Sequence, residues 1–138
     1  MQAYCWSDLS VGMNAQFRVR LTAEAIWQFS CLSGDTNPLH LDEQFARAAG
    51  FRSQVAFGLL TSSYYSQLVG VHLPGKWTLL HGLVVEFKAP AYSGDELTVF
   101  GEIVHMTEAY RRLEVKAQIS RDNVVISKAT IQAGVREP

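Results

Sequence analysis

The hydrophobic pattern changes its period along the chain, from about 3.6 residues in much of the first half to 2 in the second half. One short alternating segment, residues 14–21, predicts a half-buried strand near the N-terminus. Two helices are expected after it, because Thr22 offers an N-cap to residues 23–32 and Asp42 offers one to a short helix that runs to Ala48. A glycine follows each of them, as is typical of a helix C-terminus.

Residues 58–70 contain no charged side chain and lie between two glycines, which predicts a third helix. A helix without a charged face is expected to be buried on most of its sides. Its small residues Ser62, Ser63 and Ser66 would let a sheet approach it closely. We therefore expect this helix to be the centre of the fold.

Strict alternation in the second half predicts further strands with one apolar and one polar face. The expected strands are 83–88, 97–104, 113–120 and 124–135. They are expected to form an antiparallel meander whose apolar face is covered by the uncharged helix. The sequence thus predicts an α+β fold in which a curved antiparallel sheet wraps around one central helix.

The chain has 138 residues, of which 48% are apolar, and no linker or repeat divides it, so one domain over residues 1–138 is expected. The 12 Lys+Arg and 13 Asp+Glu residues nearly balance and form no basic cluster, which argues against nucleic acid as a partner. No apolar stretch approaches the roughly 18–20 residues that span a bilayer. The first residues also lack the features of a signal peptide. We expect a cytoplasmic protein that does not bind membranes.

Metal-binding patterns are absent from the sequence. Cys5 and Cys31 lie far apart, with no second cysteine or histidine at ligand spacing. His72 and His105 likewise have no partner at ligand spacing. We expect two reduced thiols and no metal site.

The segment 33–40 reads Ser-Gly-Asp-Thr-Asn-Pro-Leu-His and is the most informative part of the chain. It places an acid, an amide and an imidazole, Asp35, Asn37 and His40, within six positions. A carboxylate and a neutral imidazole that converge on one water can polarise it and move a proton. Spacing alone leaves ordinary turn chemistry as the alternative, because Asp, Asn, Gly and Pro are common loop residues.

Residues 29–42 closely resemble the hydratase motif of the MaoC-like family, the R-specific enoyl-CoA hydratases and dehydratases of hotdog fold. The resemblance continues through Phe45, Ala46 and Phe51 and the start of the uncharged helix, and into residues 87–97. It covers most of the chain between its first predicted strand and the middle of the sheet. It implies a hotdog fold, a helix wrapped by an antiparallel sheet.

The resemblance also implies roles for single residues. The Asp and His that match Asp35 and His40 hold and activate a water, which adds across the 2,3 double bond of an enoyl thioester. The Asn that matches Asn37 helps to bind and orient within the loop. The backbone N–H that matches Gly58 binds the thioester carbonyl, as suits a helix N-terminus with unpaired N–H groups. Ser63 matches a helix serine that buttresses the loop.

Two positions depart from the family pattern. Phe57 stands where the family usually has His, and Gln54 stands where Pro is common. The backbone donor of Gly58 survives both changes. Phe57 is therefore a candidate substrate-binding residue that shapes the pocket mouth, together with Asn37 and Ser63, or else it is plain packing.

The resemblance implies a hydro-lyase that interconverts trans-2-enoyl-CoA and (R)-3-hydroxyacyl-CoA, with coenzyme A or another thioester carrier as part of the substrate and no other cofactor. A hotdog thioesterase is one alternative, although such enzymes usually place a carboxylate on or just before the central helix, and residues 58–70 contain none. A non-catalytic hotdog subunit, or a dehydratase for a non-fatty acyl group, is another. A homodimer or higher even oligomer is expected, because family members pair edge to edge.

Overall fold

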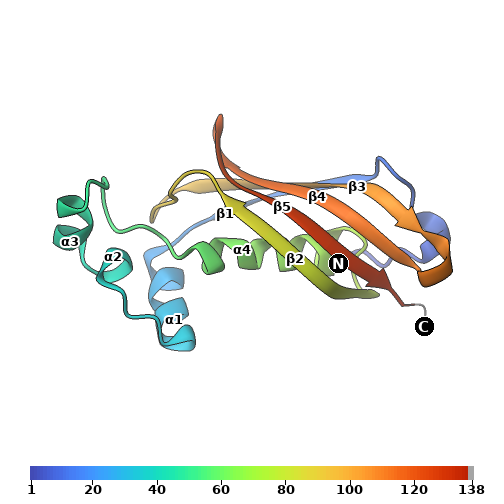
Figure 1. Ribbon diagram of the computed structural model, residues 1–138, viewed down its shortest axis with the longest axis horizontal. Helices are drawn as coiled ribbons and strands as arrows, with labels where there is room; N and C mark the ends of the chain where they lie inside the picture. Colours follow the sequence, from blue (N-terminus) through green and yellow to red (C-terminus); the bar gives the residue numbers. More distant parts are fainter. Residues whose placement is uncertain (137–138) are drawn as a thin grey trace.

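A five-stranded antiparallel sheet curves around one central helix in the computed structural model, which describes residues 1–136 (Figure 1). The strands are β1 (Asn14–Arg20), β2 (Thr78–Phe87), β3 (Glu96–Thr107), β4 (Arg112–Arg121) and β5 (Val124–Val135). The central helix is α4 (Gly58–Gln67), and it continues into a π-helical turn, η2 (Leu68–His72). The predicted α+β fold with a curved sheet around a central helix is confirmed.

Three short helices project from one end of the sheet (Figure 1). They are α1 (Ala23–Ser33), α2 (Pro38–Leu41) and α3 (Glu43–Ala48), and two 3-10 turns, η1 (Trp6–Asp8) and η3 (Glu108–Tyr110), lie elsewhere. The predicted caps are confirmed: the Thr22 hydroxyl accepts the Ala25 N–H at 3.1 Å, and the Asp42 carboxylate accepts the Phe45 N–H at 3.0 Å. Gly34 ends α1 with a φ of 75°, which residues other than glycine rarely adopt.

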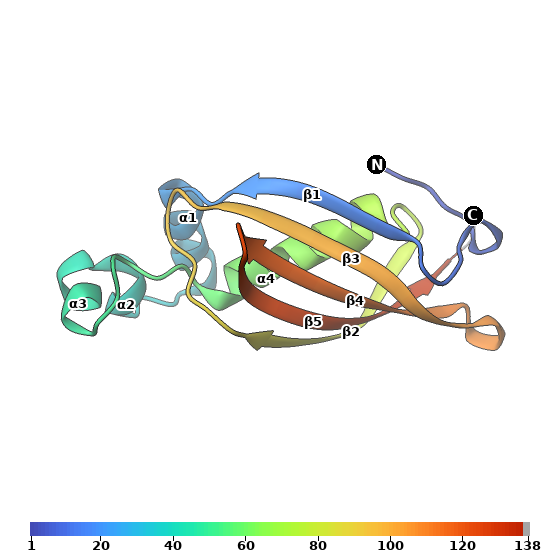
Figure 2. The same cartoon turned by 90° about the horizontal axis from the view of Figure 1, so that it is seen from above.

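The order of the strands differs from the predicted meander. The sheet runs β1-β3-β4-β5-β2, so only β3, β4 and β5 follow one another as expected. The prediction that β2 and β3 are neighbours was wrong, because β2 pairs with β5 and β3 pairs with β1. Figure 2 shows the reason: α4 lies across the sheet with its C-terminal end toward β1, and the chain then turns back to form β2 at the edge opposite β1. Alternation in a sequence fixes which face of a strand is buried, and it leaves the neighbouring strand open.

The concave face of the sheet carries the core. Val99, Val115 and Ile131 are fully buried, whereas Lys116 on the other face is exposed, which confirms the predicted alternation. Gly101 allows the closest approach of helix and sheet, because a Cβ at this position would lie 2.5 Å from the Leu68 side chain. A pair of buried polar groups also joins helix and sheet.

Tyr65 of α4 and Ser127 of β5 form that pair. Their hydroxyl oxygens are 2.8 Å apart, and both side chains are almost completely buried. Burial raises the pKa of Tyr65 above its usual value. The hydrogen bond satisfies both hydroxyls, so neither of these two groups is left unpaired in the core.

One stripe of α4 is not covered by the sheet. Leu59 is 71% exposed, and Ser63, Ser66 and Gln67 on the same side are exposed too. The expectation that this helix is buried on most sides is therefore only partly met within one chain. The exposed stripe lies beside β2, with a small cavity of about 190 Å³ between them.

Candidate active site

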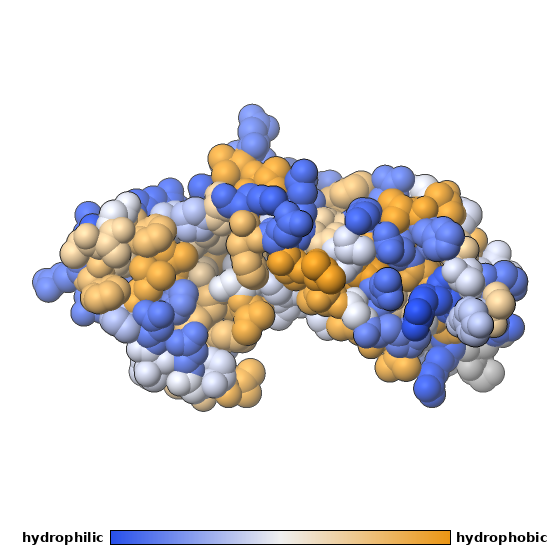
Figure 3. Space-filling model, viewed as in Figure 1, coloured by the Kyte–Doolittle hydropathy of each residue, from blue (hydrophilic) through white to orange (hydrophobic). Residues whose placement is uncertain are grey.

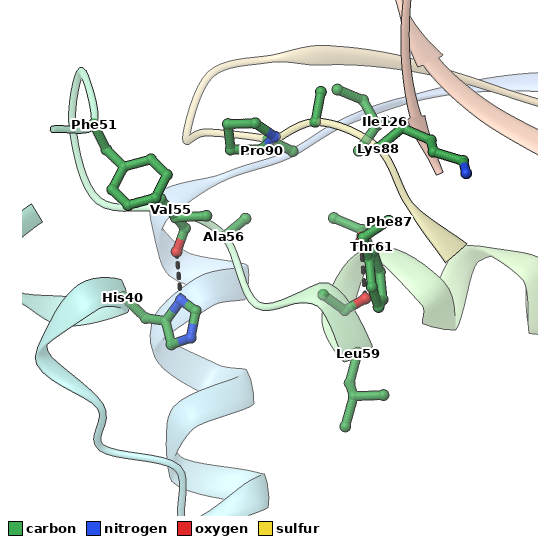
Figure 4. Close-up of a pocket in the computed structure, with 13 residues that line it drawn as sticks. His40, Phe51, Val55, Ala56, Leu59, Thr61, Phe87, Lys88, Pro90 and Ile126 are labelled. Carbon is green, nitrogen blue, oxygen red and sulfur yellow. Dashed lines mark hydrogen bonds between the residues drawn. The ribbon is translucent and has the colours of Figure 1, made fainter. Parts of the chain in front are cut away.

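The largest cavity, of about 550 Å³, opens between α2, the N-terminus of α4 and the segment that follows β2 (Figure 4). Its walls are mostly apolar. The lining residues are His40, Phe51, Val55, Ala56, Gly58, Leu59, Thr61, Phe87, Lys88, Ala89, Pro90, Ala91 and Ile126. His40 and Gly58, two of the predicted catalytic residues, are thus brought to one cavity although 18 positions separate them in the sequence.

His40 is held by a single strong hydrogen bond. Its Nδ1 lies 2.6 Å from the backbone carbonyl oxygen of Val55, as the dashed line in Figure 4 marks. A carbonyl oxygen can only accept, so Nδ1 carries the proton in the neutral ring. Nε2 then has a free lone pair and is the nitrogen that can take a proton from a bound water. The structure supplies a base in the required tautomer.

A one-turn helix that the sequence analysis missed presents His40. This helix, α2, begins at Pro38 with Asn37 as its N-cap. The Asn37 side-chain oxygen accepts the Leu39 N–H at 3.0 Å. The available signal was an N-cap residue followed by proline at the first helical position. Asn37 therefore shapes the loop that carries His40, and it does not line the cavity.

Asp35 lies on the exposed loop just before this helix. One carboxylate oxygen accepts the Asn37 N–H at 3.0 Å, and the Asp35 carbonyl accepts the Ser30 hydroxyl at 2.8 Å. Both contacts fix the turn. Asp35 does not line the 550 Å³ cavity of one chain. Within residues 1–136 no hydrogen bond joins it to His40.

Gly58 is the first residue of α4, opposite His40. No side chain caps this helix, and its first N–H groups have no partner inside the helix. The hydroxyls of Thr61 and Ser62 both donate to the Gly58 carbonyl, at 2.9 and 2.8 Å, and brace the turn. The Phe87 ring packs on Gly58 so closely that a Cβ would lie 2.8 Å from it. A side chain at this position would displace the Phe87 ring, and Gly58 lines the cavity.

Ser63 and Phe57 are placed away from the cavity wall. Ser63 is exposed, donates to the Leu60 carbonyl at 2.6 Å and lines the smaller cavity beside β2. Phe57 is only 2% exposed and packs behind His40. Neither side chain lines the 550 Å³ cavity.

The charge at the cavity is confined to its rim. Lys88 lines the cavity and its ammonium lies 2.5 Å from a carboxylate oxygen of Glu86. This hydrogen bond and charge lower the pKa of Glu86 below its usual value. The ion pair is exposed, so it stays ionised at the mouth while the interior is apolar.

A buried carboxylate that the sequence analysis did not single out joins the two loops of the cavity wall. Asp95 is 7% exposed and accepts from the guanidinium groups of Arg52, at 2.7 Å, and Arg121, at 2.6 Å. Within its own loop, the Asp95 Oδ2 also accepts the Tyr92 N–H at 2.9 Å. The Arg52 guanidinium lies 4.2 Å from the centre of the Tyr92 ring.

This group, the Asp95 clamp (Arg52, Tyr92, Asp95 and Arg121), holds the loop before α4 against the loop after β2. The Ala56 N–H then donates to the Ala91 carbonyl at 2.8 Å, next to the carbonyl that holds His40. In the sequence, the only signal for the Asp95 clamp was the Gly94-Asp95 pair, which is typical of a turn.

Residues 1–136 contain no group of three or more His, Cys, Asp or Glu side chains placed to hold a metal ion. Cys5 and Cys31 are free thiols. In the same part of the chain no helix is both long and apolar enough to cross a membrane.

Comparison with known proteins identifies the family. Residues 9–125 match the family described as MaoC like domain, and the chain belongs to it. The (R)-specific enoyl-CoA hydratase of Aeromonas caviae is 39% identical over 101 residues, which are 73% of this chain and 75% of that protein. The 3-hydroxybutyryl-CoA dehydratase of Methylorubrum extorquens is 29% identical over 121 residues, 88% of this chain and 77% of that one.

Solved structures agree. The (R)-hydratase from A. caviae involved in PHA biosynthesis superimposes with a TM-score of 0.88 at 31% identity, over 93% of this chain and 98% of that one. R-hydratase PhaJ1 from Pseudomonas aeruginosa superimposes with a TM-score of 0.89 at 25% identity, over 96% of this chain and 86% of that one. The predicted hotdog fold is confirmed.

The Asp95 clamp makes a prediction about stability. Replacing Asp95 with Asn should lower the free energy of unfolding by about 2–3 kcal/mol, because the half-buried Arg121 loses its counter-ion and the new NH2 group faces one of the donors that the carboxylate accepted. Urea unfolding followed by fluorescence measures this. Arg52→Gln is the control and should cost under about 1 kcal/mol, since that side chain is 57% exposed. Equal losses in the two variants would contradict the account.

Proposed function

We propose that this protein adds water to the 2,3 double bond of a trans-2-enoyl thioester and removes it from the (R)-3-hydroxyacyl thioester. The observation that carries the proposal is the imidazole of His40, held with a basic Nε2 in the same cavity as the helix-terminal amide of Gly58. The A. caviae and M. extorquens relatives, named as a hydratase and a dehydratase, support it. α4 carries no carboxylate, which argues against the thioesterase alternative.

The chemistry follows from these two groups. The thioester carbonyl accepts the Gly58 N–H, which makes C3 electrophilic. A water between His40 and C3 loses a proton to Nε2 as its oxygen bonds to C3, and the electron pair of the double bond moves to the carbonyl oxygen. The enolate collapses when C2 takes up the proton that Nε2 removed from the water, which regenerates the neutral imidazole, and water elimination follows the same path backwards. In this scheme Asp35 orients the water and Asn37 positions the loop.

The substrate is an acyl group on coenzyme A or another thioester carrier, and no further cofactor takes part in this scheme. Residues 1–138 act as one domain in the cytoplasm, without nucleic acid or membrane as a partner. These points come from the sequence and stay predictions.

The working form is a homodimer built on the edge of β2. This strand pairs only with β5 among the described strands, so its other edge is open. It also exposes apolar side chains, of which Val84 is 67% and Phe87 52% exposed. Figure 3 shows strongly apolar side chains at the surface in the middle of the view, where Figure 1 places β2 and α4. An open apolar edge invites pairing with another strand.

A two-fold axis at β2 would continue the sheet into a second copy. The partner would then also cover Leu59 and the small cavity between α4 and β2. Ser63 lines that small cavity, so in this arrangement its side chain would lie near the partner subunit.

The test of the proposed reaction is loss of enoyl absorbance with crotonyl-CoA and longer enoyl thioesters. His40→Ala and Asp35→Asn should each lower kcat by at least about 100-fold, the usual contribution of general acid–base catalysis. His105→Gln, which changes an exposed histidine far from the cavity, should be close to wild type. A folded wild-type protein that is inert on every enoyl thioester would refute the proposal, and release of free thiol would favour a thioesterase.

The dimer is tested by Val84→Lys, which puts a charge on the open edge. Sedimentation at micromolar concentration should show a dimer for the wild type and a monomer for the variant. Val124→Lys is the matched control, since Val124 is a 43% exposed valine at the start of β5, and it should stay dimeric. A monomeric wild type would contradict the arrangement.

A further inference from the structure

The aromatic ring of Phe57 packs against the imidazole of His40 in a tilted arrangement. The Phe57 ring and the imidazole have centroids 4.0 Å apart and planes inclined by 34°. Phe57 is 2% exposed and does not line the cavity. Its side chain therefore reaches a bound substrate only indirectly, and its contact in the site is His40.

Phe57 is itself tightly held. The Phe29 ring of α1 packs against it with centroids 5.1 Å apart and an inclination of 47°. The Phe57 carbonyl accepts the Thr61 N–H at 3.1 Å and so belongs to the first turn of α4. Backbone and ring are thus fixed from two directions, and Phe57 is a rigid backing for its neighbour.

His40 needs such a backing. Its one hydrogen bond, from Nδ1 to Val55, defines the tautomer and anchors one corner of the ring. With this hydrogen bond alone, the plane of the ring could still tilt about Nδ1, and such a tilt would move Nε2. A ring packed on one face removes this freedom. Small errors of position matter, because about 1 Å of misplacement can cost about 100-fold in rate.

We propose that Phe57 is a positioning residue that fixes the plane of the His40 imidazole, so that Nε2 stays directed at the reacting water. This inference rests on the proposed hydratase function. It replaces the interpretation of Phe57 as a residue that touches substrate. A phenyl ring suits this role because it is flat and leaves no buried nitrogen to satisfy.

The experiment compares Phe57→Leu, Phe57→His and Phe29→Leu in the full-length protein. Phe57→Leu keeps an apolar side chain and removes the flat ring, so kcat should fall about 10- to 100-fold while KM stays within about threefold. Phe57→His restores a flat ring and should lie nearer to wild type than Phe57→Leu. Phe29→Leu alters the same aromatic cluster without touching His40, and its kcat should stay within about threefold of wild type.

A second readout does not depend on activity. Ring protons stacked on a phenyl face shift upfield in proton NMR, so the His40 Cδ2 and Cε1 protons should be upfield in the folded wild type and return toward unfolded values in Phe57→Leu. Unshifted His40 protons in the wild type would overturn the inference, whether or not the variants fold. So would a Phe57→Leu kcat equal to that of wild type, or an equal loss in Phe29→Leu. An inert wild type with shifted His40 protons would refute the hydratase function and leave the contact itself established.

Discussion

The burial of α4 is the constraint on which the rest of the structure depends. This helix has no charged residue, and the sheet curves to cover most of its surface. The close approach at Gly101 and the Tyr65–Ser127 hydrogen bond make that cover tight. Because α4 lies across the sheet, its N-terminus emerges at one end, where Gly58 meets the loops of the cavity (Figure 2). The position of the Gly58 amide is therefore a consequence of packing.

The other half of the site depends on contacts between loops. His40 takes its tautomer from a carbonyl 15 residues away, and the loop that carries this carbonyl is tied by Arg52 to Asp95. Apolar walls around a neutral imidazole and a backbone amide suit a reaction that moves one proton and spreads charge onto a carbonyl oxygen. The charged groups at the rim, Lys88 and Glu86, form an ion pair with each other.

Much of the fold was predictable because it follows from local chemistry. The caps at Thr22 and Asp42 and the left-handed Gly34 each depend on a few neighbouring residues. The neighbour of β2 could not be predicted, since pairing is decided by where α4 delivers the chain. The Val55–His40 bond was also beyond reach, because a backbone carbonyl leaves no trace in residue type. The place of Asp35 in the site was not predictable either. The sequence motif points clearly to this residue, but in a single chain it does not line the cavity.

The central claim is that the Val55 carbonyl holds His40 with its proton on Nδ1. Nitrogen-15 NMR of the imidazole, at a pH where His40 is neutral, measures this directly. The account predicts a protonated Nδ1 and an unprotonated Nε2 for His40, whereas the exposed His105 should show mainly the Nε2–H form that free histidine prefers. A neutral His40 with its proton on Nε2 would contradict the account, because that nitrogen could then not act as the base.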